Sequence, residues 1–162
     1  KPFQLGDLVE TADGLGTVKE ISLTFTKLET PDGLWLMTPN SVLSSGKITN
    51  YTALGRRRAE IRVGASYDAA VSDVRAACLD AAARVPGVLP DPAPIVYVDS
   101  YGESSISYIV RVWCRSEDYT DVYYGLTEGL KAAFDEHGVE MPYNHLNIHI
   151  LDQTEQKEKQ TV

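Results

Sequence analysis

The spacing of hydrophobic residues changes near residue 55, and this change divides the chain into two modules. In residues 3–52 they recur mostly at alternate positions, in short stretches separated by turn signals. In residues 57–152, strand-like alternation is mixed with stretches that repeat every three or four residues, which is helical spacing. A chain of 162 residues is long enough for two small domains. We therefore predict domains over residues 1–55 and 56–143, with the boundary around Ala53–Arg58.

The first module is predicted to be a small β barrel of SH3 or Sm type. Its short strands are separated by Ala12-Asp13-Gly14 and Pro31-Asp32-Gly33. The second sequence strongly predicts a hairpin, because glycine tolerates the positive φ that a tight turn requires. No stretch of this module has helical spacing, and its last long strand stops at Pro39-Asn40. Several short strands joined by tight turns are typical of such barrels.

The second module is predicted to have the order β-α-β-β-α-β, which is the ferredoxin-like arrangement and makes the whole chain α+β. Ser66 or Asp68 is expected to cap its first helix. The glycine after His137 is expected to end its second helix, because glycine readily takes the left-handed position there. The expected elements are a strand Ala59–Val63, a helix ending at Pro86-Gly87, strands Ile95–Val98 and Ser105–Arg115, a helix from Asp118–Asp121 to His137-Gly138, and a strand His145–Leu151.

Two sets of apolar residues are expected to form the core of this second module. One set occupies a single face of the long strand: Ile106, Tyr108, Val110, Val112 and Cys114. The other forms the apolar stripe of the second helix: Val122, Leu126, Leu130, Ala133 and Phe134. Cys78 and Cys114 lie in such periodic segments, so both are expected to be buried thiols. Residues 153–162 are polar and are predicted to form a flexible tail.

The sequence offers no group of residues that predicts catalysis, a metal or a cofactor. His145 and His149 are four positions apart on a predicted strand, which separates them by about 13 Å, too far for one metal ion. Asp118 and Asp121 are interpreted as favourable charges at a helix start and not as an acid–base pair. The net charge of −8 argues against nucleic acid as a partner, because an acidic surface repels phosphates.

The ends and the boundary of the chain leave alternatives open. The chain starts at Lys1 without an initiator methionine, so it is either processed or an excerpt. No run approaches the roughly 18 apolar residues that a membrane span needs, and no signal peptide is present. The arginines of Arg56–Arg58 are interpreted as a solvated surface, with two alternatives: they line a polar opening, or they pair with acidic neighbours.

Several short motifs, in order and at compatible spacings, give the most specific information. They are Pro2-Phe3-Gln4-Leu5-Gly6-Asp7-Leu8-Val9 with Gly16-Thr17-Val18, Thr30-Pro31-Asp32-Gly33 with Thr38-Pro39-Asn40-Ser41, Ile48-Thr49-Asn50-Tyr51-Thr52, Val63-Gly64-Ala65-Ser66-Tyr67-Asp68, and Ser104-Ser105-Ile106 with Val110-Arg111-Val112-Trp113. Together they resemble the small-conductance mechanosensitive channel (MscS) family over about residues 1–152. Ser41 departs from the family, which often has glycine there. The candidate structural motif residues are Gly6, Gly16, Gly33, Pro39, Asn40 and Asn50.

The resemblance implies a channel subunit and not an enzyme. Family members are homo-heptamers of the inner membrane whose cytoplasmic domains enclose a vestibule, and they open under tension to release ions and small solutes in hypo-osmotic shock. Membrane helices are then expected before Lys1, and this chain is expected to be the soluble cytoplasmic portion. Gly46 matches a glycine near the junction with the pore helix, although a simple turn glycine is an equal alternative.

The resemblance also implies that residues 144–152 contribute one strand to a small barrel shared by seven chains. The alternation of polar and apolar residues there suits a barrel wall. The candidate barrel residues are His145, Leu146, Asn147, Ile148, His149 and Ile150. Two other hypotheses remain: a ligand-binding or protein-interaction module of two small domains, and a hidden enzyme of acylphosphatase type. The latter requires an arginine–asparagine oxyanion site, which the sequence does not locate.

Overall fold

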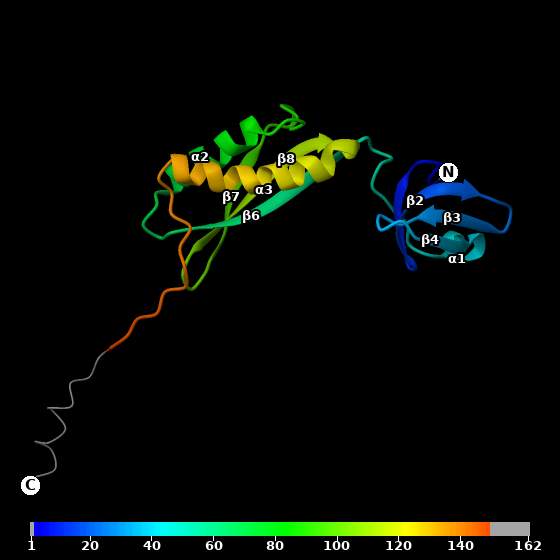
Figure 1. Cartoon of the computed structure of the whole chain (residues 1–162), viewed down its shortest axis with the longest axis horizontal. Coiled ribbons are helices and arrows are strands. Elements are labelled where there is room, and N and C mark those ends of the chain that lie inside the picture. The colour runs from blue at the N-terminus through cyan, green and yellow to red at the C-terminus, as the bar shows by residue number, and fades with distance from the viewer. Residues whose placement is uncertain (1, 150–162) are drawn as a thin grey trace, which may run out of the picture.

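The structure, a computed structural model, describes residues 2–149 and contains two sheets with separate hydrophobic cores. Figure 1 shows the two sheets as separate bodies joined by the connection between β5 and β6. The first body contains β1 (Leu8–Thr11), β2 (Gly14–Ile21), β3 (Phe25–Glu29), β4 (Trp35–Pro39), α1 (Asn40–Ser45) and β5 (Thr49–Asn50). The second contains β6 (Arg56–Ala65), α2 (Val71–Arg84), β7 (Ile95–Tyr101), β8 (Ile106–Arg115), the 3₁₀ turn η1 (Ser116–Asp118) and α3 (Tyr119–Glu136).

The first body is an antiparallel sheet in the order β4-β3-β2-β1-β5. Both predicted turns join antiparallel strands: β1 pairs with β2 across Ala12 and Asp13, and β3 pairs with β4 across the predicted hairpin turn that contains Gly33. Val9, Val18 and Leu28 are buried at its centre, one from each of three neighbouring strands. Five short strands around one small core agree with the predicted Sm-like domain.

Helix α1 was not expected from the sequence of the first module. It has six residues, of which only Leu43 is buried. One and a half turns are too short to show a repeat of three and four residues, so the prediction of strands alone was wrong at this point.

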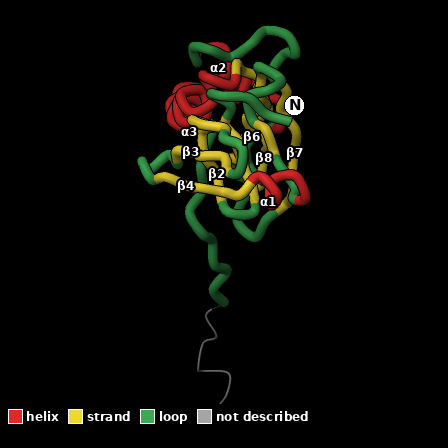
Figure 2. Tube along the Cα trace, turned by 90° about the vertical axis from the view of Figure 1, so that its right-hand side faces the viewer, coloured by secondary structure: helices red, strands yellow, loops and turns green. Residues whose placement is uncertain are grey.

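The second body is an antiparallel sheet in the order β6-β8-β7, with α2 and α3 together on one side of it (Figure 2). The predicted core is confirmed, because every apolar residue assigned to the inner face of β8 and to the stripe of α3 is buried. Cys78 and Cys114 are free and buried, as predicted. Burial raises the pKa of the Cys78 thiol to about 12, so it stays protonated at neutral pH.

The start of α2 differs from the prediction. The residue before the helix is Ala70, which provides no side-chain cap, and the Ser66 hydroxyl accepts a hydrogen bond from the Asp68 amide, 3.2 Å away. Ser66 and Asp68 thus form a turn before the helix and do not cap it. The end of α3 agrees with the prediction, since Gly138 follows His137 with a φ of 66°.

The last predicted strand, His145–Leu151, is only partly within the described residues. Residues 144–149 form no regular element there, and Ile150 and Leu151 lie outside the described part. A strand requires a neighbouring strand, and within residues 2–149 no strand pairs with residues 144–149. The sheet accordingly holds three of the four ferredoxin-like strands, and a strand in a shared barrel stays a prediction.

Candidate functional site

Two of the motif residues, Gly6 and Asn50, lie where the chain enters the first domain. Asp7, with 7% of its surface exposed, lies at the centre of a polar network there. The Asn50 side-chain amide donates to the Asp7 carboxylate at 2.7 Å and to the Pro2 carbonyl at 3.2 Å. The Gln4 amide and the Thr52 hydroxyl also donate to Asp7, at 2.9 and 3.1 Å. The network therefore fixes the entering segment, residues 2–7, to the end of β5.

These contacts change the acidity of Asp7. The hydrogen bond from Asn50 lowers the pKa of Asp7 below its ordinary value of 3.8; desolvation opposes this, and the bonds from Gln4 and Thr52 reinforce it. A lowered pKa in the folded state means that the carboxylate stabilises the fold above its unfolded-state pKa. That stabilisation is lost as the pH falls through the lowered value.

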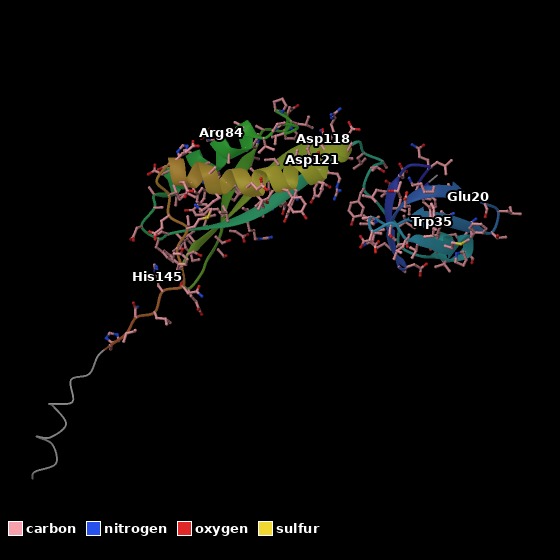
Figure 3. The ribbon with its side chains drawn as sticks, viewed as in Figure 1. Glu20, Trp35, Arg84, Asp118, Asp121 and His145 are labelled. Carbon is pink, nitrogen blue, oxygen red and sulfur yellow. The ribbon has the colours of Figure 1, made fainter. Side chains whose placement is uncertain are left out.

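We therefore expect Asp7→Asn to lower the free energy of unfolding by about 2 kcal/mol at neutral pH, because a charged acceptor of three hydrogen bonds is lost. As the pH falls from 3.8 through the lowered pKa of Asp7, the difference from the original protein should shrink, since the carboxylate takes up its proton first in the unfolded chain and then in the folded one. Urea unfolding followed from neutral to acidic pH measures both effects. Glu20→Gln, at an exposed position of β2 (Figure 3), is the control and should change little. A difference that stays constant with pH would contradict the role of Asp7.

A second network surrounds Asn40 at the first residue of α1. Its side-chain oxygen accepts a hydrogen bond from the Thr26 hydroxyl at 2.8 Å. Its side-chain amide donates to the carbonyls of Ser22 and Leu23, at 2.9 and 3.1 Å, and its backbone amide donates to the Thr24 carbonyl. Asn40 thus holds the loop between β2 and β3 against the start of α1. Pro39, immediately before it, ends β4.

The predicted glycines occupy three different environments in this domain. Gly16 packs against β3: a Cβ atom at this position would lie 2.8 Å from the Leu28 Cβ and 3.1 Å from the Glu29 carbonyl oxygen. Gly33 has a φ of 83°, as its turn requires, and Gly6 lies in the turn before β1. Gly46 ends α1, with its amide donating to the Val42 carbonyl. A close approach of a pore helix to Gly46 stays a prediction.

The two networks flank a crevice of about 180 Å³. Apolar residues from the entering segment, β2, α1 and the region before β5 line most of it: Pro2, Phe3, Ile21, Leu43 and Ile48. Asn40, Thr26 and Ser44 complete its wall. The candidate site therefore consists of buried polar bonds and an apolar crevice that hold residues 2–7 against the first domain. No group of His, Cys, Asp or Glu suited to a metal ion occurs among residues 2–149.

A contact between the two domains centres on Arg57. Its guanidinium carbon lies 3.5 Å from the ring centre of Tyr119 at the start of α3 and 4.7 Å from that of Tyr51 in the first domain. The Tyr51 hydroxyl donates to Glu10 of β1 at 2.5 Å, and this bond raises the pKa of Tyr51. Ser116 adds a hydrogen bond from its hydroxyl to the Tyr51 carbonyl at 3.2 Å. Together these contacts connect the two domains.

We expect Arg57 and Tyr119 to be energetically coupled by about 1 kcal/mol, as for a partly buried cation–π contact. The double-mutant cycle of Arg57→Ala and Tyr119→Ala in urea unfolding measures this coupling. Tyr124, on the same helix but 63% exposed, provides the matched control, and its cycle with Arg57→Ala should be additive. Equal coupling in both cycles would show that Arg57 has no specific contact with Tyr119.

One alternative raised by the sequence for Arg56–Arg58 was that these arginines pair with acidic neighbours. Arg58 pairs with Glu60 at 2.7 Å, so the pairing alternative holds for this arginine. Asp118 and Asp121 lie at the start of α3, as predicted, and the Asp118 carboxylate pairs with Arg115 at 2.8 Å. His145 lies at the lower left of the second domain in Figure 3, and its amide donates a hydrogen bond to the Ser104 hydroxyl.

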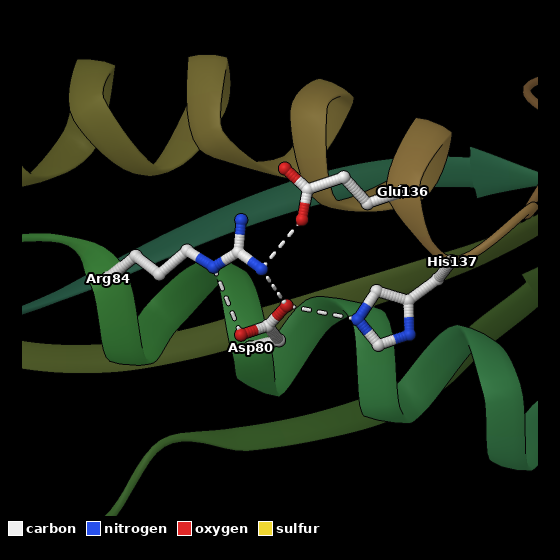
Figure 4. A network of polar contacts seen from close by, with 4 residues as sticks. All are labelled: Asp80, Arg84, Glu136 and His137. Atoms are coloured by element: carbon white, nitrogen blue, oxygen red, sulfur yellow. Dashed lines mark hydrogen bonds and ion pairs between the residues drawn. The ribbon is translucent and has the colours of Figure 1, made fainter.

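A further network joins α2 to the end of α3 (Figure 4). Arg84 contacts Asp80 at 2.6 Å and Glu136 at 2.7 Å, and Asp80 contacts the His137 ring at 3.0 Å. The hydrogen bond to His137 is the main reason why the pKa of Asp80 is lowered. The i, i+4 spacing of Asp80 and Arg84 could have indicated one of these pairs. The pairs to Glu136 and His137 depend on how the helices pack.

Comparison with known proteins agrees with this architecture. The family described as "Mechanosensitive ion channel, beta-domain" matches residues 1–53, and the family described as "Mechanosensitive ion channel MscS, C-terminal" matches residues 59–141. Both domains of the chain therefore match domain families of mechanosensitive channels, in the same order. The chain belongs to the MscS family, which is a family of ion channels and not of enzymes.

Individual relatives give the same result. A small-conductance mechanosensitive channel of Edwardsiella ictaluri is 31% identical over 150 residues, which are 93% of this chain and 52% of that protein. An uncharacterized MscS family protein of Archaeoglobus fulgidus is 33% identical over 88% of this chain and 50% of its own length. The crystal structure of Helicobacter pylori MscS in the closed state superimposes with a TM-score of 0.86 and 28% identity, over 94% of this chain and 60% of that one. The chain thus spans about half the length of these curated relatives. Within residues 2–149, no helix combines the length and the hydropathy of a membrane span.

Proposed function

We propose that the intact protein is a mechanosensitive channel of the inner membrane and that this chain is its cytoplasmic portion. The observation that carries the proposal is the match of both domains, in order, to the two families of channel domains. The relatives are about twice as long as the stretch they share with this chain, which supports further sequence in the intact protein. We propose that this sequence includes apolar membrane helices before Lys1.

The proposed activity is the release of ions and small solutes during hypo-osmotic shock. Membrane tension favours a wider open state because it does work when the channel expands in the plane of the bilayer, so tension shifts the population between two states. The polar network of Asp7 and Asn50 fixes residues 2–7 to the first domain. A force on the chain before Pro2 would therefore reach the sheet directly, and we propose that the attachment supports the pore.

The proposed assembly is a homo-heptamer, with residues 144–152 of seven chains forming a small barrel. The described part of this segment fits the proposal because its apolar side chains are exposed: Leu146 is 86% and Ile148 is 79% exposed in one chain. Burial of these two side chains between copies would stabilise the ring. Light scattering of the intact protein in detergent should give the mass of seven subunits.

Patch-clamp recording of membranes that carry the intact protein tests the activity. Suction should activate discrete currents, and cells without other mechanosensitive channels should survive a sudden dilution of the medium better when they produce it. Leu146→Asp with Ile148→Asp should reduce the fraction of heptamer, whereas Leu54→Asp, at an 87% exposed position between the two domains, should not. Full-length protein that reaches the membrane but passes no tension-activated current would overturn the channel function.

A further inference from the structure

In the second domain, α2 and α3 cover one face of the sheet (Figures 1 and 2). The opposite face carries arginines. Arg56, Arg58 and Arg62 alternate with buried residues on β6, and Arg111 lies on β8 beside them. Arg111 is the cross-strand partner of Glu60, and Arg58 is that of Trp113. We call this surface the open sheet face. Its arginines contrast with the net charge of −8 of the chain.

The carboxylates on this face balance only some of its positive charge. Arg58 and Arg111 both contact the same oxygen of Glu60, at 2.7 and 2.9 Å, so one negative charge serves two guanidinium groups. Arg62 pairs with Asp99 at 3.1 Å. Among residues 2–149, Arg56 has no carboxylate within ion-pair distance. Arg115, the cross-strand partner of Arg56, pairs with Glu117 and Asp118. Arg56, Arg58 and Arg111 therefore have one carboxylate between them, and this part of the face keeps a positive excess.

Aromatic rings hold two of these guanidinium groups in place. Arg56 lies over the ring of Trp113, with its guanidinium carbon 5.2 Å from the ring centre, and Arg111 lies over Tyr97 at 5.6 Å. A guanidinium group stacked on a ring keeps its N–H donors at its edge, where they can reach an anion. Rigid strands and stacked side chains lose less conformational entropy on binding than free surface arginines do.

The spacing of the arginines favours an anion with several oxygen groups. Alternate residues on a strand are about 6.7 Å apart, and neighbouring strands are about 4.8 Å apart, so an anion with several phosphates can contact two or three guanidinium groups at once. Bidentate contacts of this type suit phosphate oxygens. A long polyanion such as nucleic acid is disfavoured, because it would also meet the acidic remainder of the chain.

From these contacts we propose that the open sheet face binds small polyphosphate anions, the chemical class that includes nucleoside di- and triphosphates. The excess charge attracts the anion, and Arg56, Arg58 and Arg111 donate to it. Glu60 keeps Arg58 and Arg111 side by side when no ligand is bound. This binding does not depend on the proposed channel activity and is a property of the second domain.

The experiment is an NMR titration of the 162-residue chain with tripolyphosphate, compared with sodium chloride at the same ionic strength. Amide signals of β6 and β8 should shift only with tripolyphosphate. The double variant Arg56→Gln with Arg58→Gln should raise the Kd about tenfold, the size expected when charge-assisted hydrogen bonds are lost. Raising the salt concentration should weaken binding further, because exposed charges are screened.

The matched control is Arg84→Gln, which removes one positive charge from the helical side of the same domain (Figure 4). Its Kd for tripolyphosphate should stay within about twofold of the original, which is the size of a long-range charge effect at ordinary salt. Equal shifts with sodium chloride would overturn the proposal, and so would equal losses in the control and the double variant. Circular dichroism confirms that each variant is folded, so that a lost fold is not mistaken for a lost site.

Discussion

Gly16→Val is expected to unfold the first domain while the second stays folded. The Cβ of any residue at position 16 would lie 2.8 Å from the Leu28 Cβ, and that neighbour belongs to the core of the domain. Neither β2 nor β3 can move away without breaking the pairing of Val18 with Leu28. We expect a loss of about 3 kcal/mol, at the upper end of the cost of overpacking. So small a domain, with three fully buried apolar residues at its centre, should not stay folded after this loss.

Hydrogen exchange measured by mass spectrometry distinguishes the two domains, because protection follows local stability. Amides of β1 to β4 should exchange rapidly in the Gly16→Val variant, and those of β6 to α3 should stay protected. Glu20→Val is the control: it places the same side chain at an exposed position of the same strand. Because valine favours strands, a loss at position 16 alone must come from the contact with β3. Protection of β1 to β4 in the Gly16→Val variant would contradict the steric argument.

Phe134→Ala is expected to have the opposite pattern, with loss of stability in the second domain only. Phe134 is fully buried in the core cluster that α3 forms with α2 and the sheet. Removing a buried phenyl ring leaves a cavity and costs about 4 kcal/mol. The Phe134 carbonyl also takes part in the end of the helix, since it accepts a hydrogen bond from the Val139 amide at 2.8 Å.

The same exchange experiment checks this prediction, with Tyr124→Ala as control. Tyr124 lies on the same helix and is 63% exposed, so its truncation should cost less than about 0.5 kcal/mol, as is usual at the surface. The amides of β6, β8 and α3 should lose protection in the Phe134→Ala variant, while β1 to β3 keep theirs. If the two variants lose equal stability, the ring of Phe134 does not hold the core together.

The tests of Gly16→Val and Phe134→Ala both depend on the presence of two separate hydrophobic cores. The spacing of apolar residues in the sequence predicts this separation. Strand alternation and helical repeats depend only on local backbone geometry, so they can be recognised without knowledge of the fold. The buried stripe of α3 from Val122 to Phe134 follows directly from that repeat. Helix α1 was missed because six residues are too few for a repeat, and Ser66 was wrongly predicted to cap a helix that begins several residues later.

For the motif residues, the sequence identified the positions, but only the structure shows what each side chain contacts. Asn40 and Asn50 were singled out by resemblance to a family, but their hydrogen-bond partners lie up to 48 positions away in the sequence. Gly16 was singled out in the same way, and its reason is the approach of β3. None of these contacts has a local pattern, because they arise only after distant strands have paired.

The sequence by itself determined the α+β class, the two modules, the buried faces and the resemblance to the MscS family. These depend on local periodicity and on short motifs, which are properties of neighbouring residues. Only the tertiary structure decided that Asp7 is buried beneath Asn50, that Arg57 stacks on Tyr51 and Tyr119 between the domains, and that three arginines of the open sheet face have one carboxylate between them. Such contacts depend on the register of paired strands and on the placement of one domain against the other, which neighbouring residues do not specify.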